Sequence, residues 1–469
     1  MATHVHAFSD DALGDDDAVG VAARIRDGQI SSLEAIEAAI ARIEKVEPEL
    51  NAVVVSDFDR ARKSAVDQHT GPFAGVPTII KDNSDRAGLP TGQGSSAFTP
   101  QPAADDGDFV RQLLAQGLIG VGKSRLPEFG FNASTEFADA PPTRNPWNTA
   151  YSPGASSGGS AALVASGALP IAHANDGGGS IRIPAAACGL VGLKPTRGRT
   201  RSEAFSAGAP VKIVSEGIVS RSVRDTAHFL AGAEKVYANP RFPRIGLVVG
   251  PSSRRLRVGV LTESVTGHAT DDETRWAVAA AASRLTSSGH DVVEMPMPVE
   301  RQFADDFAHY WGVLAAAISA TGRRTLGRDF DAKRTDNLTR GLTAEFRRHL
   351  LRTPGVIYRL RKSEHAYAQI FADYDVVLSP TLAHTTPQLG HLSPAQPFEQ
   401  LFDRLLRYVA FTPLNNATGG PAVSLPMAMS DAGLPIGVQF SAAHGDERTL
   451  LELAYEVEQD HGWARIQDA

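Results

Sequence analysis

The N-terminal part of the chain alternates apolar and polar positions with the period of an α-helix. Three aspartates at 15–17 precede an amphipathic stretch that ends at Gly28, and SSLE at 31–34 has the form of a capping box for a second helix. The second helix would carry on one face the apolar side chains of Leu33, Ile36, Ile40 and Ile43. Amphipathic helices of this kind usually cover a body that the rest of the chain supplies.

The middle and the C-terminal part alternate short apolar runs with helical patterns, which is typical of an α/β protein. A strand at 256–261, a helix at 271–286 and a strand at 291–295 form a βαβ unit, so part of the sheet must be parallel. Further strands are expected at 73–80, 118–122, 376–379, 422–427 and 436–440, helices at 109–117 and 447–459, a turn followed by a helix at 217–230, and a helical pattern at 300–372.

Composition narrows the function mainly by exclusion. The 469 residues are 42% hydrophobic and 21% charged, as expected of a soluble globular protein with a large core. A formal net charge of -7 argues against a general nucleic-acid binder. No apolar run is long enough for a membrane span, and the start lacks the basic and apolar segments of a signal peptide, so we expect a cytoplasmic protein. The single cysteine, Cys188, excludes an internal disulfide and a cysteine-built zinc site, and an inert buried thiol is expected.

Two loops rich in glycine and serine lie close together in the sequence. Residues 156–160 are SSGGS, residues 175–180 are NDGGGS, and a mostly apolar stretch at 161–174 joins them. Glycine allows several backbone amides to converge on one reacting atom, so this pair favours a catalytic or binding site. A flexible linker or plain tight packing has a similar composition, but the apolar stretch between the loops makes a linker the weaker interpretation.

A lysine follows two isoleucines where the strand at 73–80 ends. Buried lysine is rare unless it is paired, and Lys81 could equally lay its stem on the apolar surface and keep its ammonium group in solvent. If the amine is buried, apolar neighbours such as Ile79 and Ile80 would lower its pKa from about 10.4 toward 7. A neutral lysine can then act as the base for a serine nucleophile, an arrangement known among variants of the serine triad.

Other common sites fail on their sequence context. Residues 154–158, GASSG, match the G-x-S-x-G elbow of α/β-hydrolases, which would make Ser156 the nucleophile, but no apolar strand precedes them. His290, His384 and His444 lie downstream in no context that marks a triad histidine. Neither glycine loop has the form of a P-loop, and no metal-ligand spacing is present, so we expect neither cofactor nor metal.

Longer motifs around these residues resemble the amidase signature family. They are GVPTIIKD at 75–82, GASSGGSAALVA at 154–165, DGGGSIRIPA at 176–185 and GLVGLKPTRGR at 189–199, with weaker matches VSRSVRD at 219–225 and GLPIGVQ at 433–439. The resemblance implies an α/β fold with a central mixed, twisted β-sheet flanked by helices on both faces. It further implies a single amidase domain over residues 1–469, with a signature core at about 70–230 and a variable, mainly helical substrate-pocket region at about 300–410.

The resemblance also assigns the roles of a Ser-cisSer-Lys triad. Ser180 corresponds to the nucleophile, Ser156 to a bridging serine that follows a cis peptide bond, and Lys81 to the general base. Ser156 would relay a proton from Ser180 to Lys81 and later to the leaving amine. The backbone amides of Gly177, Gly178 and Gly179 would form the oxyanion hole, although the family usually has threonine where Gly177 stands.

The residues beside the triad receive supporting roles in this interpretation. Ser157 is expected to be a structural hydrogen-bonding group, and Asp176 and Arg182 are expected to flank the nucleophile and to support it or pair with each other as ions. Lys194 and Arg197 would hold the core motif together.

The substrate is less well specified than the chemistry. AHANDGGGS at 172–180 resembles a subgroup that includes hydrolases of the cyclic 6-aminohexanoate dimer. Candidates for an apolar pocket, each equally explained by core packing, are Phe307, Tyr310, Trp311 and Phe330. We expect an amidase that acts on a small-molecule amide and binds neither nucleic acid nor membrane, and that could form a homodimer. The alternatives are a cyclic-amide hydrolase and the amidase subunit of a tRNA-dependent amidotransferase; the complete triad disfavours a catalytically inactive binding protein.

Overall fold

A mixed eight-stranded sheet forms the centre of the protein, as a computed structural model describes it for residues 4–203 and 208–468. The strand order is β4-β6-β5-β10-β11-β9-β7-β8, and β7 runs parallel to β8 and to β9 while the other pairs are antiparallel. The strands are β4 Ile171–Asp176, β5 Val191–Lys194, β6 Ser215–Ser220, β7 Arg257–Val260, β8 Asp291–Glu294, β9 Val376–Pro380, β10 Ala422–Met429 and β11 Pro435–Ala442. Helices flank this sheet, which confirms the α/β class and the parallel βαβ unit.

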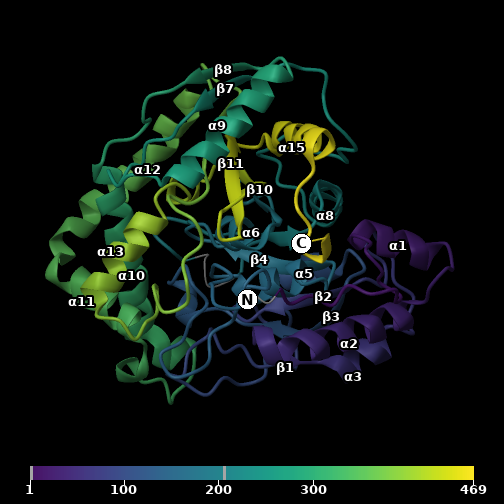
Figure 1. The fold of residues 1–469 in the computed structure, drawn as a ribbon. Coiled ribbons are helices and arrows are strands. Elements are labelled where there is room, and N and C mark those ends of the chain that lie inside the picture. The colour runs from purple at the N-terminus through teal and green to yellow at the C-terminus, as the bar shows by residue number, and fades with distance from the viewer. Residues whose placement is uncertain (1–3, 204–207, 469) are drawn as a thin grey trace.

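Helices from distant parts of the sequence surround the sheet (Figure 1). Those of the N-terminal part, α1 to α3, and those of the later region, α10 to α13, lie on opposite sides of the molecule in this view. The helices are α1 Ala18–Arg26, α2 Ser32–Leu50, α3 Phe58–Ser64, α4 Asp108–Leu114, α5 Gly158–Ala165, α6 Arg182–Cys188, α8 Val223–Val236, α9 Asp272–Ser287, α10 Gln302–Thr325, α11 Asn337–Arg348, α12 Thr353–Ile370, α13 Phe398–Tyr408, α14 Pro413–Thr418 and α15 Glu447–His461. None of the helices in the described residues is long and apolar enough to cross a membrane.

The predicted helix starts at the N-terminus are present. The Asp17 side chain caps α1, and the capping box of α2 forms between Ser31 and Glu34. One member of the expected apolar face is misplaced, because Leu33 is 37% exposed whereas Ile36, Ile40 and Ile43 are buried. Leu33 lies in the first turn of α2, where the helix begins outside the core.

A second, three-stranded sheet carries the lysine that the sequence singles out. Its order is β1-β3-β2, with β1 at Val53–Ser56, β2 at Pro77–Lys81 and β3 at Ile119–Ser124. The strand expected at 73–80 is shorter at its start, because the Val76 amide closes a turn onto the Phe73 carbonyl. The Thr78 hydroxyl donates to the Ile171 carbonyl at 3.1 Å and so joins β2 to the first strand of the large sheet. This contact places the end of β2 beside the end of β4.

The stretch between the two serine loops folds into α5 followed by β4, rather than one apolar segment. The turn expected near Gly217 is also wrong: residues 215–220 form the interior strand β6. β6 is buried on both faces and therefore lacks the alternation that marks a half-exposed strand. A Cβ atom at Gly217 would lie 3.0 Å from Ile181, so this glycine permits close packing inside the strand.

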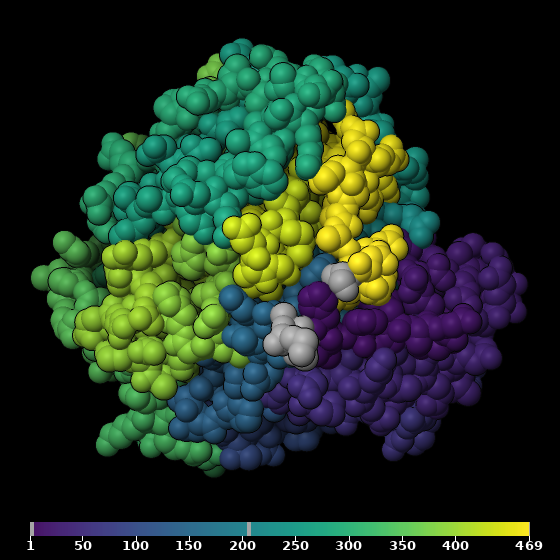
Figure 2. Space-filling model, viewed as in Figure 1, coloured from purple at the N-terminus to yellow at the C-terminus, as the bar shows by residue number. Residues whose placement is uncertain are grey.

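The two ends of the described chain meet at the surface. Phe8 and Ile466 pack in one small apolar cluster with Trp147. Figure 2 shows the N-terminal residues in purple beside the yellow C-terminal segment.

Candidate active site

The side chain of Lys81 is completely buried, so the solvent-exposed alternative is wrong for this lysine. Its Nζ atom lies 2.7 Å from Ser156 Oγ and 2.7 Å from Asn175 Oδ1. Burial lowers the pKa of Lys81 to about 7, although the charges of Glu216 and Asp176 act in the opposite direction. A lysine in this state can hold or release a proton near neutral pH.

Ser156 lies in the loop before α5, and the peptide bond between Ala155 and Ser156 is cis, as the family resemblance implies. The backbone of Gly130 passes close to this serine, because a Cβ atom at Gly130 would lie 3.0 Å from Ser156 Oγ. The neighbouring Ser157 donates its hydroxyl to the Asn175 carbonyl at 3.4 Å. The Ser156 hydroxyl therefore faces Lys81 while the Ser157 hydroxyl holds the loop against β4.

Ser180 lies between β4 and α6 and is 7% exposed. It borders a small cavity together with Gly130 and Gly178. Within the described residues no hydrogen bond is recorded for its hydroxyl. The three residues of the predicted triad come from β2 and from the two serine loops. Lys81 is hydrogen-bonded to Ser156, and Gly130, whose backbone lies close to Ser156, lines the same cavity as Ser180.

The glycine amides before Ser180 are not equivalent. The Gly179 N–H donates to Asp176 Oδ1 at 2.7 Å, so a carboxylate already occupies this predicted oxyanion donor. No backbone hydrogen bond from the Gly177 or Gly178 amide is found within the described residues, and Gly178 lines the cavity at Ser180. Gly179 has φ +129, and a Cβ atom there would lie 2.4 Å from Thr412 Oγ1. Gly179 therefore shapes the loop by its conformation and by its contact with Asp176.

Asp176 and Arg182 form a completely buried ion pair, with Arg182 Nε 2.9 Å from Asp176 Oδ2. Burial alone would raise the pKa of Asp176, but the Arg182 guanidinium holds this pKa at about 2. Asn416 donates to Asp176 Oδ1 at 2.8 Å, and the Thr412 hydroxyl donates to the Gly178 carbonyl at 2.6 Å. Side chains from the C-terminal part of the chain, which no local motif had marked, thus hold the loop at residues 177–180 that ends at Ser180.

The cavity at Ser180 has a volume of about 70 Å³ and is lined almost entirely by apolar groups. Two of the predicted pocket residues, Phe307 and Trp311, line it, whereas Tyr310 and Phe330 belong to the core. The remaining lining residues are Gly130, Phe131, Asn132, Ala133, Gly178, Ile183, Ala308, Phe402, Leu405, Leu406, Val409 and Pro413.

A group of buried polar side chains on β4 and β6, which was not predicted, is hydrogen-bonded to Lys81 through its β4 members. Asn175 and His173, which follow each other on one face of β4, both contact the buried carboxylate of Glu216 on β6. The only sequence signal was that His173 and Asn175 lie in an otherwise apolar run before the glycine-rich loop that ends at Ser180. Glu216 carried no signal of its own.

The comparisons with known proteins agree with this geometry. A family model described as Amidase matches residues 34–451. The chain belongs to this amidase family. Over 464 residues it is 50% identical to "Putative amidase AmiC" of Mycobacterium leprae, covering 99% of both chains. It is 36% identical to the 6-aminohexanoate-cyclic-dimer hydrolase of a Pseudomonas strain, covering 95% of both.

A solved structure of 6-aminohexanoate cyclic dimer hydrolase superposes with a TM-score of 0.88 at 33% identity, covering 98% of this chain and 99% of the other. The fold is therefore that of an amidase signature enzyme, and the protein is a hydrolase that acts on carbon–nitrogen bonds.

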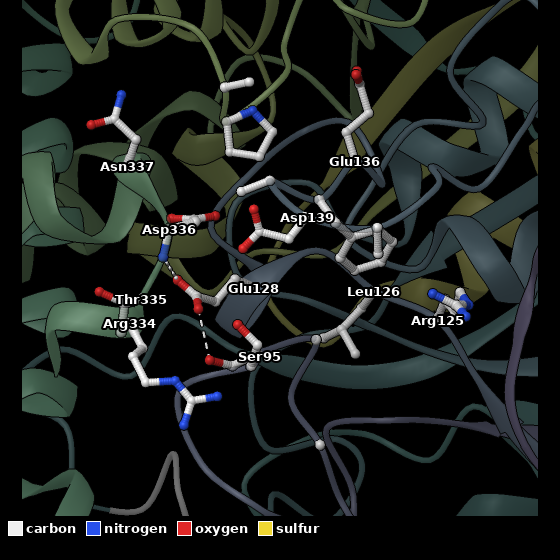
Figure 3. A pocket seen from close by; sticks show the side chains of 18 of the residues that line it. Ser95, Arg125, Leu126, Glu128, Glu136, Asp139, Arg334, Thr335, Asp336 and Asn337 are labelled. Atoms are coloured by element: carbon white, nitrogen blue, oxygen red, sulfur yellow. Dashed lines mark hydrogen bonds between the residues drawn. The ribbon is translucent and has the colours of Figure 1, made fainter. Parts of the chain in front are cut away.

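A cavity of about 1000 Å³ (Figure 3) has none of the predicted triad residues Lys81, Ser156 and Ser180 in its lining. Glu128, Asp139 and Asp336 point into it, and dashed lines in the figure join Glu128 to Ser95 and to the Asp336 backbone. Glu128 also accepts the Thr339 hydroxyl at 2.7 Å. This carboxyl thus ties the start of α11 to the turn that leads to Gly130.

Three further predictions concern residues outside the site. Lys194 is buried and donates to the Pro195 carbonyl and Ser215 Oγ, and Arg197 donates to the Ala417 carbonyl, so both hold core segments together. Cys188 is buried, and burial raises the pKa of its thiol. In the described part of the chain no group of three or more His, Cys, Asp and Glu residues is arranged to hold a metal ion.

Proposed function

We propose that this amidase hydrolyses a neutral small-molecule amide through an acyl-enzyme on Ser180. The observation that carries the proposal is the 2.7 Å contact between a wholly buried Lys81 amine and Ser156 Oγ, next to the cavity that Ser180 borders. A buried amine of lowered pKa is suited to remove a proton through a serine relay.

The proposed acylation moves one proton from Ser180 through Ser156 to Lys81. The Ser180 oxygen bonds to the amide carbon, its proton passes to Ser156, and the proton of Ser156 passes to Lys81 Nζ. The carbonyl electron pair moves to the oxygen, where the amides of Gly177 and Gly178 would receive the negative charge. Collapse expels the amine, which takes a proton back along the same path. Water then repeats the sequence on the acyl-enzyme and releases the acid.

The lining of the cavity at Ser180 favours a substrate that places an uncharged, apolar group there. None of the described residues that line it carries a charged side chain. A volume of about 70 Å³ corresponds to roughly five water-sized groups, since one water needs about 10–15 Å³ on the same measure. A short aliphatic amide fits this space. Free glutamine, a zwitterion, would find no ionic partner there, which disfavours the amidotransferase alternative.

Hydrolysis of a series of primary amides from acetamide to octanamide, with L-glutamine as the comparison, tests the substrate class. We expect kcat/KM to be highest for the short amides of the series and to fall toward octanamide, and glutamine to remain intact. A preference for glutamine, or activity that appears only with partner proteins, would contradict the proposal. Cyclic amides belong in the same screen, because the relatives include a cyclic-dimer hydrolase.

A fluorophosphonate reagent tests the nucleophile without knowledge of the substrate. Mass spectrometry should place the adduct on Ser180, and Ser180→Ala should abolish both labelling and hydrolysis. Lys81→Ala should nearly abolish both. An adduct on Ser156 would show that the two serine roles are reversed, and full activity of either variant would refute the mechanism.

A further inference from the structure

Two hydrogen-bonded paths lead from Lys81 to one buried carboxylate. The Lys81 side chain donates to Asn175 Oδ1 at 2.7 Å, and Asn175 Nδ2 donates to Glu216 Oε1 at 3.4 Å. The Lys81 backbone N–H donates to His173 Nδ1 at 3.2 Å, and His173 Nε2 lies 3.2 Å from Glu216 Oε2. His173 is buried and Glu216 is 1% exposed. The four residues therefore form a closed ring inside the protein.

The direction of every bond in this ring is fixed by chemistry. His173 Nδ1 accepts a backbone N–H, so its proton must sit on Nε2, which then donates to Glu216. Asn175 Oδ1 accepts from Lys81 and also from Asn83 at 3.3 Å, so the Asn175 amide nitrogen faces Glu216. Both oxygens of Glu216 thus receive N–H donors, which is the arrangement that suits an ionised carboxylate.

Strand pairing holds this arrangement rigidly. Asn175 and Glu216 are directly opposite each other in the antiparallel β4–β6 pair, and His173 lies two residues before Asn175 on the same face. Lys81 reaches the same face from the end of β2. The ring is therefore built from three strands, and no mobile loop is needed to complete it.

We propose that Glu216 is a positioning residue of the amidase reaction, which acts through Asn175 to hold Lys81 in place and to stabilise its protonated form. The inference rests on the proposed function of Lys81 as the base. When the proton of Ser156 arrives on Lys81 Nζ, a buried ammonium forms, and the carboxylate of Glu216 supplies its counter-charge. Glu216 takes no proton in this step. His173 stays neutral and fixes the second carboxylate oxygen.

Charge couples the two ends, because the charge of Glu216 acts to raise the pKa of Lys81 and the charge of Lys81 acts to lower the pKa of Glu216. Burial raises the pKa of Glu216 to about 8, so it is the pair of N–H donors from Asn175 and His173 that favours the ionised carboxylate in the ring. Burial also lowers the pKa of His173 well below its ordinary value, with Lys81 and Lys123 acting in the same direction. The charged groups that face the ring from neighbouring elements are Asp176 of β4 with its partner Arg182 of α6, Lys123 of β3, Lys194 of β5 and Glu203.

The test measures the rate of fluorophosphonate labelling of Ser180 against pH in the wild type, in Glu216→Gln and in Glu216→Asp. Removal of the counter-charge should lower the labelling rate of Glu216→Gln by about tenfold or more. It should also move the acid limb of the profile to lower pH, because Lys81 loses a group that favours its charged form. Glu216→Asp keeps the charge and should restore the position of the limb.

Glu128→Gln is the matched control, because Glu128 is also a buried carboxyl whose pKa burial raises to about 8. Among the described residues Glu128 makes no hydrogen bond to Lys81, Ser156 or Ser180. The acid limb of the labelling profile of Glu128→Gln should therefore stay at the wild-type position. An unchanged limb and a rate within about twofold of wild type in Glu216→Gln would overturn the inference while the proposed function stands.

Asn175→Ser provides a second, independent variant. It removes the bridge but keeps Glu216, so it should reproduce the slower labelling, and it carries the test if the Glu216 variants do not fold. Wild-type rates in Asn175→Ser would overturn the inference. Absence of labelling at Ser180 in the wild type would instead refute the proposed function itself.

Discussion

The indole Nε1 of Trp311 donates a hydrogen bond to the Phe131 carbonyl at 3.1 Å, and both residues line the small cavity at Ser180. This bond joins α10 to a loop of the N-terminal half. The ring of Trp311 also packs against that of Phe131, with centroids 5.6 Å apart. Trp311 therefore sets both the width of the cavity and the position of the helix that borders it.

Replacement of Trp311 should change substrate length preference. Trp311→Ala opens the cavity, so kcat/KM for a short amide should fall about tenfold while that for octanamide should rise. Trp311→Phe keeps one aromatic ring but loses the indole N–H and part of the ring volume, so its preference should lie closer to wild type than that of Trp311→Ala. The measurement is the profile of kcat/KM over the amide series, with thermal unfolding to confirm that each variant is folded. An unchanged profile in Trp311→Ala would show that this cavity does not hold the substrate.

The pH dependence of acylation should follow Lys81. Its pKa is lowered to about 7, and only the neutral amine can accept the serine proton. The labelling rate of Ser180 should therefore be low at acid pH, reach half its maximum near pH 7, and level off above that value. Stopped labelling reactions analysed by mass spectrometry give this profile. A rate that continues to rise up to the ordinary lysine pKa of about 10.4 would show that the amine is not shifted in the working enzyme.

Gly179 should tolerate no side chain. A Cβ atom there would lie 2.4 Å from Thr412 Oγ1 and 2.7 Å from Ile183 Cδ1, at a φ of +129 that L-residues rarely adopt. Gly179→Ala should displace the loop that carries Ser180 and reduce kcat/KM by about a hundredfold or more. Gly120→Ala is the matched control, because its nearest contact would be Ile80 at 4.0 Å. Comparable losses in the two variants would mean that the effect is not specific to the nucleophile loop.

The sequence identified the triad candidates because each is marked locally. Lys81 interrupts an apolar strand, and Ser156 and Ser180 lie in glycine-rich loops. The strands and helices were mostly placed within a few residues for the same reason, since their periodicity is a local property. Interior strands were harder to predict when their apolar and polar residues do not alternate. The start of β6 was interpreted as a turn because of Gly217.

The groups that support the triad were not predictable in this way. Asn175 meets Glu216 only because β4 and β6 pair in one register. Asn416 and Thr412 contact Asp176 and Gly178, beside Ser180, from more than two hundred positions along the chain. Such contacts depend on tertiary packing, and a single sequence carries no record of strand register or of which loops meet.

Glu128 should make the stability of the amidase depend on pH. Its carboxyl is buried and accepts hydrogen bonds from Ser95, the Asp336 amide and Thr339. Burial, and then the nearby charge of Asp336, raise the pKa of Glu128 to about 8 in the folded state. The folded protein therefore binds this proton more tightly than the unfolded chain, in which the pKa is near 4.5.

The resulting stabilisation is fully present below pH 4.5 and is lost as the pH rises through 8. Urea unfolding at several pH values should show the wild type losing free energy of unfolding over this range faster than Glu128→Gln, which has no proton to release. One proton limits the difference in slope to about 1.4 kcal/mol per pH unit. Identical slopes in the two proteins would show that Glu128 is already ionised in the folded state, and that its three donors outweigh the effect of burial.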